Sequence, residues 1–116
     1  MTALERQTVR VFIADFSKCG TKAGFFRLMV LAFGLKLSAL PTGESVFWSA
    51  LCKRLAAVSK GFVPVRVRLS GLENIYSFYP KGVETLLRIL RAAEEESPLF
   101  RAEVRIGDAL WRVSGK

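Results

Sequence analysis

Residues 63–70 read VPVRVRLS, and this alternation of apolar and polar side chains decides the fold class. Every second position is apolar, and these residues are Val63, Val65, Val67 and Leu69. The other face of an extended chain then carries Arg66, Arg68 and Ser70, which predicts a half-buried β-strand. Because Pro64 lacks an N–H for the ladder, we expect the start of this strand to lie at a sheet edge or outside the ladder.

Three predicted helices flank this strand, two before it and one after it. Residues 21–34 have helical length and composition, and residues 44–60 and 81–97 place apolar residues at three- and four-residue spacing. Thr21 is a suitable N-cap for the first helix, and Gly34 stands where a C-terminal glycine is common. We expect these helices to pack on the sheet to which the strand belongs.

Further strands are predicted toward both ends of the sequence. Residues 8–16 (TVRVFIADF) are rich in β-branched and aromatic residues, which favours a central strand. Residues 100–113 predict a hairpin of FRAEVRI and ALWRV around a two-residue turn at Gly107 and Asp108. Residues 75–79 predict an optional short strand.

These elements follow the order strand, helix, helix, strand, optional strand, helix, strand, strand. The order is typical of an α/β, or α+β, sandwich in which three helices pack on one face of a small mixed sheet of four to five strands. A length of 116 residues predicts a single domain over residues 1–116. Nine Phe, two Tyr and two Trp are many for one small core, so a homodimer is a possible assembly.

The apolar stretches do not predict a membrane protein. Glu5 and Arg6 precede the first apolar run, unlike the pattern of a signal peptide. The most apolar window, residues 24–40, contains Arg27 and Lys36 and does not reach the roughly 18 uninterrupted apolar residues of a membrane span. We therefore expect a cytoplasmic protein that has no membrane partner.

The net charge of +8 is concentrated in the first part of the sequence. Residues 1–72 contain 11 Lys and Arg against three Asp and Glu, whereas residues 73–116 contain seven of each kind. A charge that segregates along the chain favours a contiguous basic surface and a polyanionic partner. We expect nucleic acid, either DNA or RNA. The alternative is an acidic protein surface on which a small adaptor or inhibitor docks.

Seven basic residues form the candidate nucleic-acid-binding set, from the loop before the first helix, the second helix and the strand quoted above. They are Lys18, Lys22, Lys53, Arg54, Lys60, Arg66 and Arg68. Free amides at a helix N-terminus suit a phosphate, although a capped helix with solvated lysines is the alternative interpretation of the loop. Gln7 and Asn74 are the only Asn and Gln side chains, so we expect backbone contacts with little sequence specificity.

Arginine is the basic residue of the predicted strands, which contain no lysine. The strand arginines are Arg10, Arg66, Arg68, Arg101, Arg105 and Arg112. The planar guanidinium donates two parallel hydrogen bonds to a phosphate and stacks on bases, and several of these side chains share a sheet face if the strands align. The alternative is an ordinary solvated face on which Glu103 pairs across strands.

Residues that could support catalysis are scarce. The sequence has no histidine, which excludes Cys-His and Ser-His-Asp catalysis and metal sites that contain histidine. Cys19 lies between Lys18 and Lys22 at a predicted helix N-terminus, which favours a thiolate, and inert packing is the alternative. Asp15 has no second acid near it in the sequence for a two-metal site. We expect a non-enzymatic protein without a cofactor or metal.

Overall fold

The computed structural model describes residues 9–35 and 43–107, together with the backbone of residues 109–112. The described elements are β1 (Arg10–Asp15), α1 (Lys22–Phe33), α2 (Glu44–Ser59), β2 (Val65–Ser70), α3 (Leu72–Phe78), α4 (Pro80–Glu96), β3 (Phe100–Ile106) and β4 (Ala109–Arg112). Thr8, Asp108 and Val113 belong to predicted strands or the predicted turn and lie outside the described residues.

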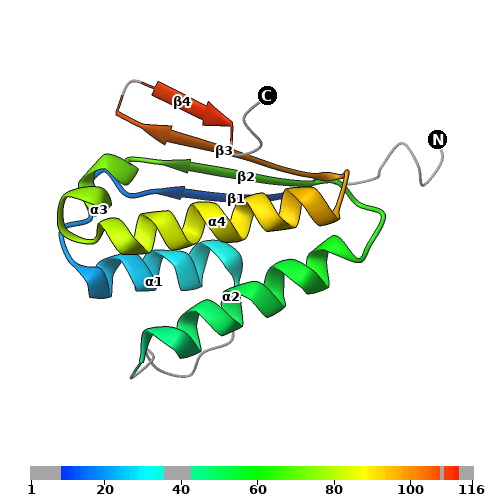
Figure 1. Cartoon of the computed structure of the whole chain (residues 1–116), viewed down its shortest axis with the longest axis horizontal. Coiled ribbons are helices and arrows are strands. Elements are labelled where there is room, and N and C mark those ends of the chain that lie inside the picture. The colour runs from blue at the N-terminus through cyan, green and yellow to red at the C-terminus, as the bar shows by residue number, and fades with distance from the viewer. Residues whose placement is uncertain (1–8, 36–42, 108, 113–116) are drawn as a thin grey trace.

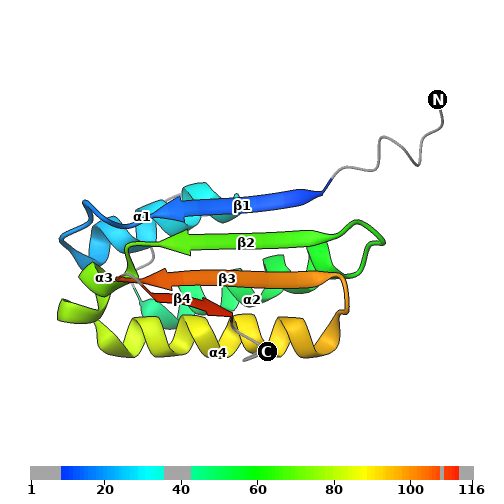
Figure 2. The ribbon, with the colours of Figure 1, turned by 90° about the horizontal axis from the view of Figure 1, so that it is seen from above.

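The four described strands form one mixed sheet in the order β1-β2-β3-β4. β1, β2 and β3 run parallel, and β4 returns antiparallel to β3. Because the spatial order follows the chain order, both parallel crossovers move across the sheet in the same direction. As a result α1, α2 and α4 lie on one face, and α3 lies at the end of the sheet where β2 finishes (Figures 1 and 2). The predicted mixed α+β class is confirmed.

The core fills the space between the sheet and the helices. Val65, Val67 and Leu69 of β2 are 1–2% exposed, as their alternation predicts. Phe12 of β1 stacks on Phe33 of α1, with 5.0 Å between the ring centroids. Because successive side chains of a strand point to opposite faces, the helices cover one half of each strand and leave the other half facing away from the core.

The predicted ends of the first helix are confirmed. The Thr21 hydroxyl accepts a hydrogen bond from the Gly24 N–H at 3.0 Å, which caps the N-terminus of α1. At the other end Gly34 adopts the left-handed conformation, with φ of 65°, and its N–H bonds to the carbonyl of Val30.

The predicted optional strand at residues 75–79 is wrong, because Leu72–Phe78 form the helix α3. Leu72 and Ile75 are both fully buried. Residues three apart lie on the same side of a helix but on opposite faces of a strand, so this burial suits a helix. The described chain therefore has four helices and four strands, one helix more than predicted.

The predicted central position of the first strand is also wrong, because β1 lies at the edge of the sheet. Its β-branched and aromatic composition favoured a central strand, but Val11 is 45% exposed and Ile13 is 62% exposed. Pro64 immediately precedes β2, outside the strand as predicted, and its carbonyl accepts a hydrogen bond from the Arg10 N–H at 2.9 Å.

Candidate nucleic-acid interface

The face of the sheet opposite the helices, here called the open face, gathers four of the strand arginines. β2 contributes Arg66 and Arg68, and β3 contributes Arg101 and Arg105. Arg66 lies in register with Arg101, and Arg68 lies in register with Glu103. Because paired residues of neighbouring strands point to the same face, these side chains share one surface. Among the described side chains of β2 and β3 on this face, Glu103 is the only carboxylate.

Two of these arginines are anchored to the backbone near the beginning of their strands. Arg66 Nη1 donates hydrogen bonds to the carbonyl oxygens of Val65 and Leu99, both at 3.1 Å. Arg101 Nη1 donates to the carbonyl oxygen of Phe100 at 3.2 Å. A guanidinium has five N–H groups, so the groups not used in these bonds are available to an anion.

The other two arginines, Arg68 and Arg105, are both exposed. The Arg68 side chain is 63% exposed, and its Nε lies 3.9 Å from Glu103 Oε1. An exposed ion pair at this distance contributes little to stability, so a phosphate can compete for Arg68. Arg105 is exposed at the far end of β3.

The two remaining strand arginines are Arg10 in β1 and Arg112 in β4. Arg10 lies in register with Val65, whose side chain is buried against the helices, so Arg10 does not belong to the open face. The backbone of Arg112 lies in register with Glu103.

The open face becomes apolar toward the β1 edge. Val11 lies in register with Arg66, and Ile13 lies in register with Arg68. The arginines of β2 therefore separate the aliphatic side chains of β1 from the arginines of β3. The face as a whole presents a basic region bordered by an apolar stripe.

Asp15 limits the basic region at the carboxyl end of β1. Its Oδ1 accepts hydrogen bonds from the Ser17 N–H at 3.0 Å and from the Ser70 hydroxyl at 3.3 Å. These bonds, that of the Ser17 N–H first, hold the pKa of Asp15 below its usual value. The carboxylate is therefore charged at neutral pH, and we expect it to repel a phosphate at this end.

The two lysines predicted for the first loop lie at the same end of the molecule, with Lys18 in the loop and Lys22 at the start of α1. Lys18 is exposed. Lys22 Nζ lies 2.9 Å from Glu44 Oε2 and 4.4 Å from the centroid of the Tyr79 ring. Lys22 is thus already engaged between helices, and the Gly24 amide at this helix N-terminus is bonded to Thr21.

The three residues predicted for the second helix lie in the helical layer, on the other side of the sheet from Arg66 and Arg68. Lys53 and Arg54 belong to α2, and Lys60 directly follows it. Arg54 Nε donates to the carbonyl oxygen of Phe33 at 3.0 Å, so this side chain joins α2 to the end of α1. Lys53 and Lys60 are exposed. The structure therefore divides the seven candidate residues among three places: the open face, the loop before α1, and α2.

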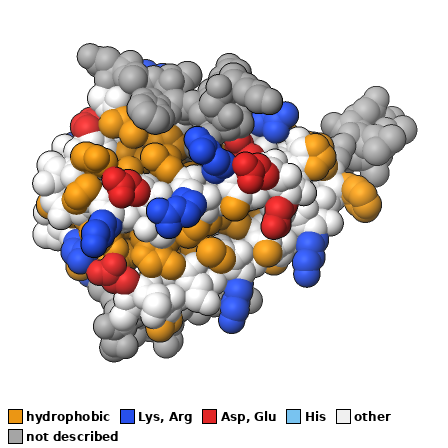
Figure 3. Space-filling view, in the orientation of Figure 1, with side chains coloured by type: hydrophobic (Ala, Val, Ile, Leu, Met, Phe, Trp, Pro, Cys, Tyr) orange, Lys and Arg blue, Asp and Glu red, His pale blue; other side chains and the backbone are white. Residues whose placement is uncertain are grey.

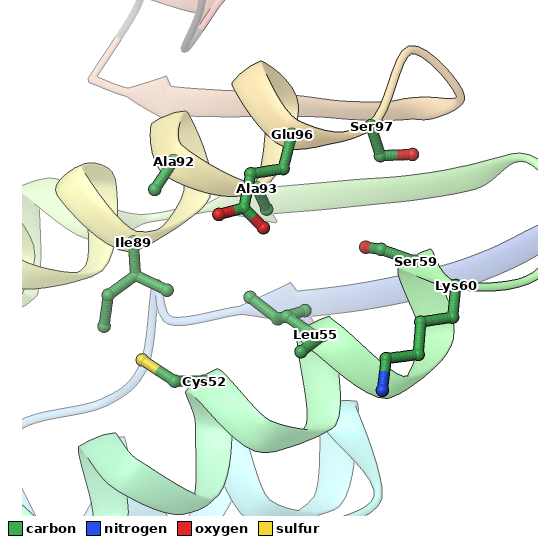
Figure 4. Close-up of a pocket in the computed structure, with 10 residues that line it drawn as sticks. Cys52, Leu55, Ser59, Lys60, Ile89, Ala92, Ala93, Glu96 and Ser97 are labelled. Atoms are coloured by element: carbon green, nitrogen blue, oxygen red, sulfur yellow. The ribbon is translucent and has the colours of Figure 1, made fainter.

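Lys60 lines a cavity of about 470 Å³ between α2 and α4 (Figure 4). Its walls are mainly aliphatic, with Leu55 from α2 and Ile89 from α4, and Glu96 supplies a carboxylate. The buried Ser59 hydroxyl, which also lines the cavity, has no hydrogen-bond partner within the described part of the chain. This apolar hollow does not resemble a phosphate site.

The exposed side of α4 carries both signs of charge. Figure 3 shows Lys or Arg side chains interspersed with Asp or Glu side chains over this helix. Glu84 and Arg88, which are one helical turn apart, are both exposed. A mixed surface of this kind does not favour a polyanion, unlike the open face.

The carboxyl ends of β1 and β2, where parallel sheets commonly bind nucleotides, are closed by internal contacts. Asn74 Nδ2 donates to the carbonyl oxygen of Phe16 at 3.2 Å and also to that of Ser17. Glu73 Oε1 accepts from the Gly107 N–H at 2.8 Å. The order of the parallel strands never reverses, so the sheet also lacks the switch point at which doubly wound folds open a crevice.

The described residues contain no group of three His, Cys, Asp or Glu side chains that could hold a metal ion. The Cys19 Sγ lies 3.4 Å from the carbonyl oxygen of Thr21, to which a thiol can donate. Within the described segments, no helix combines the length and the apolarity that a bilayer span requires.

The described surface thus has two predominantly basic regions: the open face at β2 and β3, and the exposed side of α1 and α2, which carries Arg27, Lys53 and Lys60. Of the two, the open face is the one on which arginines of neighbouring strands lie in register. Asn74 and Glu73, which close the strand ends, carried no signal in the sequence, because their partners lie far away along the chain. Comparison of the chain with protein-family models, with curated proteins and with solved structures finds no match.

Proposed function

We propose that this chain is a small, non-enzymatic nucleic-acid-binding protein that contacts the phosphate backbone through the open face of its sheet. One observation carries the proposal: Arg66, Arg68, Arg101 and Arg105 share a face that no described helix covers, with Glu103 as the only described carboxylate on those two strands. Arginine suits this role because its planar fork donates paired hydrogen bonds to phosphate.

The same face favours binding with little sequence specificity. None of the described side chains on the open face is Asn or Gln, the residues that read adenine edges well. Contacts to phosphate position a protein on a nucleic acid but carry no sequence information. We therefore expect similar affinity for different sequences and a steep dependence on salt.

The second candidate is an acidic protein partner, and it is favoured by the aliphatic border of the basic region. Val11 and Ile13 lie beside Arg66 and Arg68, so an acidic surface with an apolar rim would also fit this face. A protein partner of this kind predicts negligible binding to polynucleotides at physiological salt.

Fluorescence anisotropy with labelled single- and double-stranded DNA and RNA separates the two candidates. The titrations should run from roughly 50 to 200 mM salt, over which phosphate-driven affinity falls by orders of magnitude. Binding that persists near physiological salt supports the nucleic-acid proposal. Its absence for all four polymers would contradict the proposal and favour the acidic protein partner.

Variants then locate the site. Arg68→Ala with Arg105→Ala should flatten the plot of log affinity against log salt by about one unit for each lost phosphate contact. Lys53→Ala with Lys60→Ala removes the same charge from α2 and is the matched control, for which we expect a smaller change. Glu103→Gln should raise affinity, because it removes the carboxylate that lies beside Arg68 on the open face. A larger effect of the lysine pair would place the site on α2 instead.

A further inference from the structure

The edge strand β1 and the residue just before it expose three apolar side chains. Val9 is 46% exposed, Val11 is 45% exposed and Ile13 is 62% exposed. They alternate along the chain, so they form one stripe on the open face. Large exposed apolar side chains gathered in one stripe often mark an interaction site.

Among the described residues, no strand pairs with the backbone of β1 along its outer edge. The Arg10 N–H bonds to the Pro64 carbonyl at 2.9 Å, and the Phe16 N–H bonds to the Ser70 carbonyl at 2.8 Å, so both point toward β2. Successive N–H groups of a strand alternate in direction, and those of Val11 and Ile13 therefore point outward.

β1 ends the sheet, and no other described strand pairs with this outer edge. An unpaired edge of this kind is a template for pairing with another chain, and proteins usually protect such edges with lysine, proline or a bulge. The stripe on β1 carries aliphatic side chains instead. The edge is thus available both to a strand and to apolar side chains.

We propose that β1 pairs antiparallel with β1 of a second copy of this chain, forming a symmetric dimer with one continuous sheet. In such a pair, residues that face each other must lie on the same face of the sheet. A two-fold axis at Phe12 places Val11 opposite Ile13 of the partner subunit. Both residues point their N–H groups outward, so this register forms hydrogen bonds and pairs these two aliphatic side chains. The same axis places Val9 opposite Asp15 of the partner subunit, toward the two ends of the strand pair.

A second copy suits this stripe because the stripe is uncharged and its own aliphatic side chains can pair across a two-fold axis. Each chain carries a net charge of +8, which opposes association, so two copies meet most easily where the facing side chains are uncharged. The stripe of Val9, Val11 and Ile13 is uncharged, and the arginines of β2 stay outside the strand pair. A nucleic acid would be attracted to the arginines instead, because aliphatic side chains add nothing to phosphate recognition.

The oligomeric state of the full chain tests the dimer. Light scattering after size exclusion should give about twice the chain mass of 12.9 kDa at high protein concentration. Ile13→Lys should give the monomer mass, because two charges would meet beside the two-fold axis. The Ile13 side chain is 62% exposed and its N–H lies outside the β1–β2 ladder, so we expect this variant to fold normally, as circular dichroism would verify.

Val46→Lys is the matched control, because Val46 is 50% exposed and lies on α2. It should remain dimeric. A monomeric wild-type protein at every concentration would overturn the proposal. An Ile13→Lys variant as dimeric as Val46→Lys would also overturn it, because the interface would then lie elsewhere.

The register can be tested by disulfide formation in a background with Cys19→Ser and Cys52→Ser. When a Val11→Cys protein is mixed with an Ile13→Cys protein and oxidised, the mixed disulfide should dominate, because opposed residues of an antiparallel pair lie within disulfide reach. Preferential linking of Val11→Cys to itself, or of Ile13→Cys to itself, would overturn the axis at Phe12.

Discussion

At the scale of single residues, Gly71 is a position at which a side chain has no room. Its φ is 74°, and a Cβ there would overlap the backbone of Phe16 and Ser17. Gly107 also has a positive φ, of 61°, but a Cβ there would meet nothing within 4 Å. Substitution of the two glycines therefore distinguishes two losses of stability. Gly107 reports the strain of the left-handed backbone alone, and Gly71 reports that strain together with the overlap of the added Cβ.

We expect Gly107→Ala to lower the free energy of unfolding by about 1–2 kcal/mol, the cost of a left-handed non-glycine residue. Gly71→Ala should lower it by about 1–3 kcal/mol more, because the backbone atoms that it meets cannot rotate away. Urea unfolding followed by circular dichroism measures both changes. Equal losses would contradict the close contact between Gly71 and the end of β1.

Features that depend on neighbouring residues were predictable from the sequence, whereas contacts between segments far apart along the chain were not. The caps at Thr21 and Gly34 depend on neighbours within one helical turn, and both predictions are confirmed. The contact of Gly71 with Ser17, and the bonds of Asn74 to the carbonyls of Phe16 and Ser17, join segments that lie far apart along the chain. No local pattern indicates them.

At the scale of elements, α3 shows how tertiary contacts override composition. Tyr76 and Phe78 favour a strand by composition, but the burial of Leu72 and Ile75 on one side of the segment fits a helix. The edge position of β1 was missed for a related reason. Apolar residues along a strand do not say what covers each of its faces. In β1 the helices cover Phe12 and Ala14, whereas Val11 and Ile13 on the other face are exposed.

Glu44 joins the N-terminal ends of three helices through two contacts. The Tyr79 hydroxyl, just before α4, donates a hydrogen bond to Glu44 at the start of α2, and Glu44 pairs with Lys22 at the start of α1. Burial and then the Glu44 carboxylate raise the pKa of Tyr79 to about 12. The hydrogen bond from Tyr79 and then that from Lys22 lower the pKa of Glu44.

The sign of the pH dependence follows from the raised pKa of Tyr79. The folded state holds the phenolic proton more tightly than the unfolded chain does, whose tyrosine pKa is near 10.0. Tyr79 therefore stabilises the fold fully below pH 10, and this contribution declines as the pH rises from 10 toward 12. Urea unfolding of Tyr79→Phe should lack this part of the decline.

A spectroscopic titration measures the same pKa directly. In the Tyr76→Phe variant, Tyr79 is the only tyrosine, and its absorbance change on ionisation should have a midpoint near pH 12. A midpoint near pH 10.0, the value for a free tyrosine, would contradict the buried contact with Glu44.

At the scale of the whole molecule, the order of the strands decides which surface is available. The sequence predicted the α+β class and helices on one face, but local patterns do not encode the direction in which each parallel crossover moves. If the direction had reversed, helices would cover both faces and the open-face arginines would be buried. The alternation of β2 predicted Arg66 and Arg68, whereas their proximity to Arg101 depended on the strand register.

The proposed dimer and the proposed binding face make a joint prediction at this scale. A two-fold axis perpendicular to the sheet turns both open faces in the same direction, so a long nucleic acid could contact the arginines of both copies. A short one would contact a single copy. Two linked sites bind a long ligand more tightly than one site does, without any new contact.

Ile13→Lys separates this coupling from simple attraction. The variant adds a positive charge to the open face, so attraction to phosphate alone would raise affinity for nucleic acids of any length. If the dimer aligns the two faces, loss of the dimer should instead lower affinity for the long strand while affinity for the short strand holds or rises. Anisotropy with one short and one long labelled strand, at one salt concentration, measures both. An equal rise in affinity for both lengths would mean that the two copies do not bind the nucleic acid together. The effect of Ile13→Lys depends on the length of the strand only if one strand contacts both copies.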